Sequence, residues 1–403
     1  QLELPAGTTV INGEGYTLLP GVIDPQVHFR DEQAENLFAA TCACAKGGVT
    51  SFLEVPNTQP LTITQTALTQ KLAIAAQNSL VNYGFFMGAT AENLEDLRTS
   101  QPTCGIKLSM GTAQGPLSVD TADTIEPIFA KGDRLIAVHA ENQARIMARR
   151  EQFSGETAPE THTKVQDNET ALLATKMALQ FSKKYQRRLH ILHVSTGEEA
   201  DWLRRDKPSW VTAEVTPQHL LLDISAYEQL GTLAQTNPPL KYPRDRELLW
   251  QALKDGVIDF IASNHAPYTL AEKSKRYPDA PSGVPGIETA LPLMLTQTQE
   301  NRCSVAEVSN WMSTAVAKAY NIPNKGLIEP GFDADLVLVD LATYRPVLRQ
   351  ELKTTCGWSP FEGWNLTGWP VVTIVGGQVG YDRGKMNTQV RGKALAFEEL
   401  VEL

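Results

Sequence analysis

The chain has 403 residues, of which 42% are hydrophobic and 20% charged, so it can bury a substantial core in one or two domains and is not disordered as a whole. Its 36 basic and 46 acidic residues give a formal charge of −10 without any basic run, which makes nucleic acid and anionic membranes poor partners. The five scattered cysteines favour a reducing compartment, and the absence of a secretory signal or of an apolar run of roughly 18 residues predicts a soluble cytoplasmic protein.

Short β-type runs alternate with amphipathic stretches from residue 21 to about residue 300. The predicted strands are Val22–His28, Thr50–Val55, Asn82–Met87, Gly105–Met110, Leu135–His139, Leu189–Val194, Val211–Val215 and Ile258–Ser263. Between them, apolar residues spaced three and four apart predict helices such as Ala34–Lys46, Gln65–Gln77, Glu169–Lys183 and Arg246–Lys254. Eight strand–helix units are typical of an α/β fold of the (β/α)8 TIM-barrel type, whose reactive groups gather at the carboxyl ends of the strands.

The two flanks of the chain have a different pattern. Residues 1–20 contain glycine turns, and residues 326–385 contain two short β runs, Asp335–Val339 and Val371–Val375, the second followed by a Gly376-Gly377 turn. We therefore expect residues 1–20 and 326–385 to form one small composite β-sandwich domain, residues 21–325 to form the barrel domain and residues 386–403 to form a C-terminal tail.

Side chains that can bind metals or transfer protons fall at the predicted strand ends. His28 ends the first strand, Lys107 lies in the fourth, His139 ends the fifth and His193 lies at the end of the sixth, while Asn264 follows the eighth. In a barrel these ends meet at one mouth, where imidazoles and a modified lysine can hold a divalent metal. The competing interpretation is that these side chains only hydrogen-bond to neighbouring groups.

The order of the motifs along the chain strongly resembles that of dihydroorotases of the amidohydrolase superfamily. The motifs are Asp24-Pro-Gln-Val-His28-Phe-Arg30, Val55-Pro-Asn57-Thr58, Gly105-Ile-Lys107, Val138-His139-Ala-Glu141, His190-Ile-Leu-His193, Glu214-Val-Thr-Pro-Gln-His219, Asn237-Pro-Pro-Leu, Ser263-Asn264-His265-Ala-Pro-Tyr268, Gly286-Ile-Glu288-Thr and Gly331-Phe-Asp-Ala-Asp335. The resemblance covers nearly the whole chain and implies the amidohydrolase type of barrel with its composite sandwich.

The resemblance implies a reversible hydrolysis that opens or closes the dihydroorotate ring at one or two zinc ions. In such enzymes a His-x-His pair, a carboxylated lysine, two later histidines and an aspartate hold the metals, and the aspartate also handles a proton. Transferred to this chain, Lys107 occupies the lysine position and His139 and His193 occupy those of the later histidines. Arg30 and Asn57 occupy positions that bind the substrate carboxylate.

Five departures from the family pattern fall in the same mouth. Gln26 stands where the first histidine of the His-x-His pair belongs, and Asn264 stands where the aspartate belongs. A glutamine amide is a weak neutral ligand, and an asparagine amide supplies neither negative charge nor a basic lone pair. The other departures are Tyr268 and Gln218 at positions where the family has histidines, and the loop Gly111-Thr-Ala-Gln114-Gly115.

These departures predict a dihydroorotase-like protein of pyrimidine biosynthesis that is catalytically inactive or strongly impaired. We expect no zinc or one zinc at reduced occupancy, held by His28, Lys107, His139 and His193 as remnants, with carboxylation of Lys107 disfavoured. By resemblance, the partner implied is aspartate transcarbamoylase, and a homodimer is expected. The alternatives are an active zinc-dependent dihydroorotase or cyclic amidohydrolase with a mononuclear site, and a protein that binds a carboxylate through Arg30 and Asn57.

Two further polar residues, Glu141 and His162, receive predictions of their own. Glu141 follows His139 and is expected to orient it or to supply negative charge at a helix N-terminus, rather than to act as a catalyst. His162, in a polar segment, is expected to be an exposed loop residue.

Overall fold

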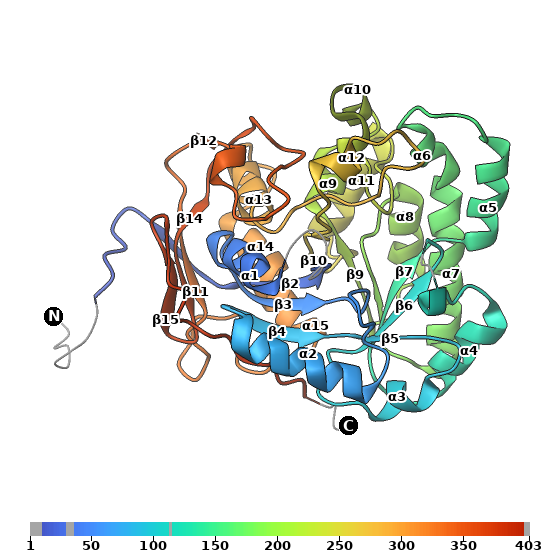
Figure 1. Ribbon diagram of the computed structural model, residues 1–403, viewed down its shortest axis with the longest axis horizontal. Coiled ribbons are helices and arrows are strands. Elements are labelled where there is room, and N and C mark those ends of the chain that lie inside the picture. Colours follow the sequence, from blue (N-terminus) through green and yellow to red (C-terminus); the bar gives the residue numbers. More distant parts are fainter. Residues whose placement is uncertain (1–9, 30–35, 113–114, 399–403) are drawn as a thin grey trace.

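The computed structural model describes residues 10–29, 36–112 and 115–398, and its centre is a barrel of parallel strands (Figure 1). The barrel strands are β2 (Val22–Val27), β3 (Val49–Glu54), β4 (Asn82–Phe85), β5 (Met87–Gly88), β6 (Ile106–Met110), β7 (Ile136–Ala140), β8 (Leu189–Ile191), β9 (Val211–Val215) and β10 (Phe260–Ile261). Strands β4 and β5 are separated only by Phe86, whose amide donates to Glu54 O at 3.0 Å, so together they form one strand of the barrel. The sheet runs in the order β2-β3-β4 and then β5-β6-β7-β8-β9-β10.

The first and last strands close the barrel. The amide of His28 donates to His265 O at 2.8 Å, and Val27 forms a parallel bridge with His265. The predicted (β/α)8 fold is therefore confirmed, although β8 and β10 end earlier than the sequence predicts. The reason is that the backbone turns there, because His193 (φ 35°) and Asn264 (φ 48°) adopt the left-handed region that ends a strand.

Helices surround the barrel and cover the outer faces of its strands (Figure 1). They are α1 (Leu37–Lys46), α2 (Gln65–Asn78), α3 (Leu94–Thr99), α4 (Ala122–Ala130), α5 (Gln143–Gln152), α6 (Thr161–Val165), α7 (Asn168–Tyr185), α8 (Gly197–Asp206), α9 (Pro217–Leu221), α10 (Ala226–Leu230), α11 (Pro243–Lys254), α12 (Leu270–Lys273), α13 (Ala290–Gln299), α14 (Val305–Ser309) and α15 (Ala315–Ala319). Helix α11 begins three residues before the predicted start because Pro243 occupies its first turn, where proline needs no amide hydrogen.

Segments from both ends of the chain form a second, antiparallel sheet. It contains β1 (Thr17–Pro20), β11 (Leu336–Asp340), β14 (Trp369–Val375), β15 (Gln378–Asp382) and β16 (Lys385–Met386), in the order β1-β11-β14-β15-β16. The predicted Gly376-Gly377 turn joins β14 to β15, and positive φ angles of 54° and 81° suit the tight turn of a hairpin. A separate pair, β12 (Arg345–Pro346) and β13 (Asn365–Leu366), lies between β11 and β14 in sequence.

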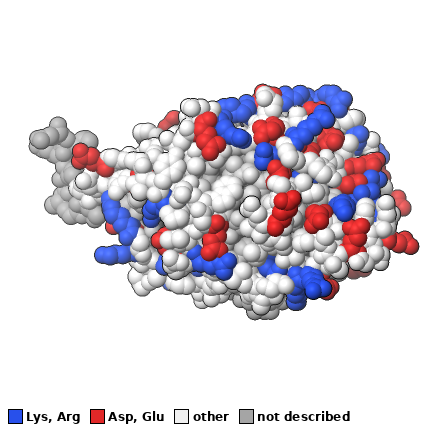
Figure 2. Space-filling model, turned by 90° about the horizontal axis from the view of Figure 1, so that it is seen from above, with Lys and Arg blue, Asp and Glu red and all other residues white. Residues whose placement is uncertain are grey.

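The C-terminal segment returns to the barrel. Residues Lys393 and Leu395 bond to the backbone of Tyr83 at 3.0 and 2.8 Å, and the side chain of Leu395 is buried. All five cysteines are free, as the sequence predicts. Within the described ranges, no helix is both long and apolar enough to cross a membrane. The face in Figure 2 carries acidic and basic side chains interspersed with one another rather than in one block of a single sign.

Candidate functional site

A cavity of about 640 Å³ opens at the carboxyl ends of the barrel strands. Its lining includes every described residue of the predicted site: Gln26, His28, Asn57, Lys107, His139, His193 and Asn264. The structure therefore brings together side chains that are up to 238 positions apart in the chain, from Gln26 to Asn264. Arg30, the other predicted carboxylate ligand, lies outside the described residues, and the chemical roles assigned to the set stay predictions.

His139 and His193 form the centre of a hydrogen-bonded chain. His139 Nδ1 lies 2.9 Å from His193 Nε2, and His139 Nε2 lies 2.9 Å from Glu141 Oε2. Since the carboxylate of Glu141 accepts, His139 carries its proton on Nε2 and accepts from His193 through Nδ1. Glu141 thus orients His139, as the sequence predicts. Burial, reinforced by nearby His139 and Lys107, lowers the pKa of His193 well below its usual range, so this imidazole is neutral at pH 7.

Lys107 projects into the same cavity from β6. Its Nζ donates to Leu108 O at 3.1 Å and to Ser109 Oγ at 3.2 Å. Burial lowers the pKa of Lys107 to about 7, while the nearby carboxyl group of Glu214 raises it in part. Burial also raises the pKa of Glu214 to about 8, so the two groups do not form a strong ion pair. A substantial fraction of Lys107 is therefore a neutral amine at pH 7.

The end of β2 presents an amide and an imidazole where the resemblance implies two histidines. The Gln26 side chain is 1% exposed, and its Oε1 atom has no hydrogen-bond partner in the described structure. His28 Nδ1 lies 3.0 Å from Asn57 Nδ2, which makes Nδ1 the acceptor because the amide nitrogen donates. Asn57 therefore contacts a neighbouring site residue, and one nitrogen of His28 is already engaged.

Asn264 occupies the position after β10 and faces a second asparagine. Its Nδ2 donates to the backbone oxygen of Asn237 at 3.1 Å. His162 in turn lies with Nε2 at 2.9 Å from both Thr236 O and Asn237 Oδ1. The prediction of an exposed His162 is wrong, because its side chain is 7% exposed and its ring donates into the loop that carries Asn237.

Sequence reasoning missed the part of the site that this loop supplies. Thr236 and Asn237 line the cavity, as do Ser282 and Gly283 from the segment before α13. The signal in the sequence was that Asn237-Pro-Pro-Leu is one of the motifs that carry the family resemblance, although no role in the site was assigned to it. Of the other departures, Tyr268 lines the cavity, whereas the amide of Gln218 donates to Ser263 O at 3.1 Å.

The donor set does not fit a pair of metal ions. Zinc sites in proteins use three or four imidazole, thiolate or carboxylate donors. Among the residues that the structure describes, no three His, Cys, Asp or Glu side chains are grouped in a way that could hold a metal ion. At two positions where the family resemblance implies metal ligands, this chain has amides. Asn264 donates an amide hydrogen to a backbone oxygen, and the unpartnered oxygen of Gln26 could offer a metal only a neutral ligand. Lys107 would add a negatively charged ligand only as a carbamate.

The fold and the strand-end site together define a barrel protein of the amidohydrolase type. The chain matches the amidohydrolase family over residues 17–380 and belongs to that family. It is 34% identical to a dihydroorotase of Methanosarcina acetivorans over 398 residues, covering 94% of this chain and 85% of the relative. It is 35% identical to a dihydroorotase of Halobacterium salinarum over 394 residues, covering 94% and 92%. The protein is thus dihydroorotase-like.

Solved structures lead to the same family. An L-hydantoinase (dihydropyrimidinase) from Arthrobacter aurescens superposes with a TM-score of 0.92 at 28% identity, covering 98% of this chain and 92% of that one. A dihydropyrimidinase from Brevibacillus agri gives a TM-score of 0.90 at 25% identity, covering 99% and 92%.

Proposed function

We propose that this dihydroorotase-like protein has lost metal-dependent ring hydrolysis and acts as a structural or regulatory partner in pyrimidine biosynthesis. The observation that carries the proposal is that Gln26 and Asn264 both line the same cavity. Both are amides, and both occupy positions where the family resemblance implies a metal ligand. An amide neither neutralises a cation nor accepts a proton at neutral pH.

Two hydrogen-bonding arrangements in the cavity support the proposal. Asn264 is held by its bond to Asn237, so its amide nitrogen faces a carbonyl and cannot relay a proton. His139 Nδ1 and His193 Nε2 are hydrogen-bonded to each other at 2.9 Å. This hydrogen bond would have to break before both nitrogens could bind one cation. General acid–base assistance is typically worth about 10²- to 10⁴-fold in rate. Its loss alone would leave a poor enzyme.

Zinc content and turnover of dihydroorotate by the purified chain test the loss of hydrolysis. We expect substoichiometric zinc by elemental analysis and a rate lower by at least about 10²-fold than that of an active relative assayed in parallel. Two zinc ions per chain together with a comparable rate would contradict the proposal.

The partner is proposed by family resemblance to be aspartate transcarbamoylase, and this chain is proposed to be a cytoplasmic homodimer. Size-exclusion chromatography with light scattering of the two purified proteins, alone and mixed at micromolar concentration, tests both points. A new, larger species in the mixture is expected. Two unchanged peaks would remove aspartate transcarbamoylase as the partner while leaving the measurement of hydrolysis unaffected.

A second candidate function is hydrolysis of a cyclic amide at a single metal. The observation in its favour is that Lys107, His139 and His193 line one open cavity and that part of Lys107 is a neutral amine, the form that reacts with carbon dioxide. A carbamate there would supply a third donor. Mass spectrometry of the native protein, together with about one zinc per chain and turnover of dihydroorotate or a hydantoin, would favour this function over the first.

A further inference from the structure

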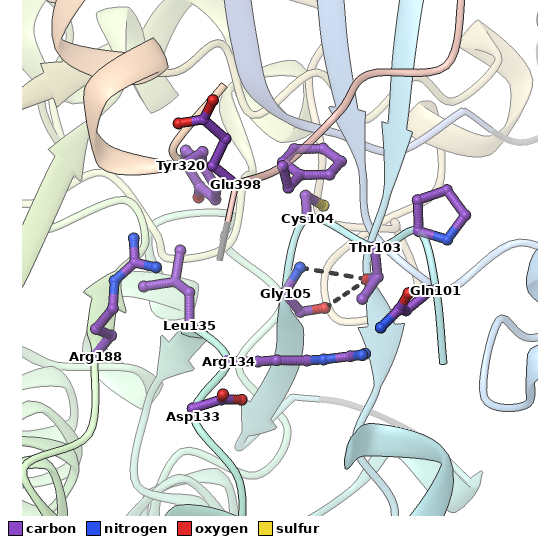
Figure 3. Close-up of a pocket in the computed structure, with 12 residues that line it drawn as sticks. Gln101, Thr103, Cys104, Gly105, Asp133, Arg134, Leu135, Arg188, Tyr320 and Glu398 are labelled. Atoms are coloured by element: carbon purple, nitrogen blue, oxygen red, sulfur yellow. Dashed lines mark hydrogen bonds between the residues drawn. The ribbon is translucent and has the colours of Figure 1, made fainter. Parts of the chain in front are cut away.

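A second cavity lies at the opposite end of the barrel from the mouth. Figure 3 shows the residues that line it. Its volume is about 190 Å³, and its walls include Cys104, Leu135 and Arg188, which stand just before β6, β7 and β8. The amino ends of parallel strands lie on the face away from their carboxyl ends, so this cavity is separate from the one that contains Lys107. Phe397, in the C-terminal segment, contributes to its rim.

Arg188 is the most unusual side chain of this cavity. One of its nitrogens, Nη2, donates to Ala319 O at 2.7 Å, at the end of α15, and this bond fixes the position of the guanidinium group. No carboxylate of the described residues lies within ion-pair distance of it. Burial lowers the pKa of Arg188 from its usual value, as expected for a desolvated cation without a counter-ion. A partly buried, unpaired charge is costly, and a bound anion would offset that cost.

Two further groups extend the polar side of the cavity. Arg134 enters from the segment before β7 and donates to Ser100 O. Tyr320 is 3% exposed, and its hydroxyl has no hydrogen-bond partner in the described part of the chain, although it lies close enough to Arg188 for the two to interact electrostatically. Figure 3 shows Arg188 on one side of the cavity and Arg134 towards the other, with Leu135 and Gly105 between them.

The acidic residues at this cavity do not neutralise Arg188. Asp133 and Glu398 both line it, but both are exposed to solvent. The charge of Asp133 acts on Arg187, the residue before Arg188, rather than on Arg188 itself. Leu135 and Phe397 add apolar surface to the lining. The cavity thus combines an unpaired guanidinium and an unpartnered hydroxyl with an apolar surface.

We propose that this cavity is a binding site for a small organic anion, in which Arg188 and the Tyr320 hydroxyl hold a carboxylate or phosphate group and Leu135 and Phe397 contact an apolar body. A guanidinium forms charge-assisted hydrogen bonds with either group, and a phenol adds one donor. The site does not depend on metal or catalysis at the mouth, so it stands whether or not the protein hydrolyses anything.

Calorimetric titration of the full chain with benzoate, phenyl phosphate and inorganic phosphate tests the site. We expect saturable binding of one of the two aromatic anions, with inorganic phosphate weaker than phenyl phosphate because it lacks the apolar body. The benzoate and phenyl phosphate titrations distinguish a carboxylate site from a phosphate site. No saturable binding of either aromatic anion at millimolar concentration would overturn the proposal.

Variants locate the bound anion. Arg188→Met should weaken binding at least tenfold, while Tyr320→Phe, which removes one oxygen, should weaken it several-fold and remain folded. Arg276→Met is the matched control, because Arg276 is exposed and lies before the segment that lines the mouth; its affinity should be unchanged. Lys107→Met tests whether the anion binds instead in the cavity at the mouth of the barrel. Binding that is lost in Lys107→Met but retained in Arg188→Met and Tyr320→Phe would place the anion at the mouth and overturn the proposal.

Discussion

Individual side chains at the mouth are held by hydrogen bonds to one another or to the backbone. Asn264 donates to Asn237 O, His28 accepts from Asn57, and His193 donates to His139. A site built for cations would present unprotonated nitrogens and carboxylate oxygens to its centre. Here two of the key positions instead present amides, and the Oε1 atom of one of them, Gln26, has no hydrogen-bond partner among the described residues. Restoring the ionisable groups should therefore change what the cavity binds.

The double substitution Gln26→His with Asn264→Asp tests this reasoning. It returns one imidazole and one carboxylate to the cavity, so we expect zinc occupancy to rise above that of the parent chain, with some turnover of dihydroorotate. Elemental analysis after dialysis against zinc gives the occupancy. A matched control is Gln218→His, a departure that contacts Ser263 O rather than the cavity and should leave occupancy unchanged. If the double variant binds no more zinc than the control, the loop or the barrel geometry is also responsible.

His162 gives a prediction about pH. Burial lowers the pKa of His162 to about 4 from 6.5, so between these values the folded chain holds a neutral ring while the unfolded chain binds a proton. Proton uptake then favours unfolding, and stability falls as pH drops below 6.5, by up to about 1.4 kcal/mol per pH unit. His162→Gln keeps a donor for Thr236 O but cannot titrate. The difference in urea midpoint between the variant and the parent should therefore shift in favour of the variant when the pH is lowered from 7.5 to 5. An equal difference at both pH values would contradict this.

The residues of the site differ in how far the sequence could predict them. The positions of His139 and His193 near strand ends follow from the alternation of strands and helices, because a barrel brings such ends to one mouth. Lys107 is the second residue of β6, and its place in the site came from the family resemblance. The burial of His162 could not be predicted, since it depends on a loop more than 70 positions away, at Thr236. The polar sequence around His162 does not indicate that the distant carbonyl of Thr236 accepts a hydrogen bond from its ring.

At the level of elements, two of the site residues, His193 and Asn264, follow the short strands β8 and β10. Strand β10 has two residues, and the chain continues from it through Asn264 to His265, which closes the barrel against Val27. The predicted strand extends two residues further, to Ser263, whereas β10 ends at Ile261 and the backbone turns at Asn264, whose φ is 48°. Propensity alone does not reveal such a turn, since asparagine tolerates both conformations.

His265 joins three elements at this closure. It is fully buried, its backbone pairs with β2, and its Nδ1 accepts from the amide of Gly286 at 3.1 Å. His265→Ala would orphan that amide and leave a cavity, so we expect the free energy of unfolding to fall by about 2–4 kcal/mol in urea denaturation. His265→Asn places an amide oxygen near the position of Nδ1 and should lose less. Equal losses for the two variants would show that the hydrogen bond to Gly286 contributes little.

Across the whole molecule, Asp335 connects the barrel to the sheet formed by both ends of the chain. Its Oδ2 accepts from Asn82 Nδ2 at 3.0 Å, on barrel strand β4, and its Oδ1 accepts from the amide of Gly376 at 2.7 Å, in the turn of the second sheet. Lys325 pairs with the same carboxylate, and the amide of Gly21 donates to Asp335 O at 2.8 Å. The composite sheet was predictable from the β runs on both flanks, but this buried connection was not, because nothing local in the sequence indicates the partners of Asp335.

Replacing Asp335 should weaken the whole molecule rather than one sheet. Asp335 is 5% exposed, and removing one partner of a buried ion pair typically costs about 3–5 kcal/mol. We expect Asp335→Ala to lower the unfolding free energy by roughly the lower figure, about 3 kcal/mol, because Lys325 keeps its contact with Asp333 at 2.8 Å. Asp340→Ala is the matched control on the adjoining strand β11, where only the turn bonds to Ala342 and Thr343 are lost, at a cost of about 1 kcal/mol. Urea denaturation followed by tryptophan fluorescence compares the two. Similar midpoints for both variants would mean that the barrel and the composite sheet are stabilised by their apolar contacts and not by the carboxylate between them.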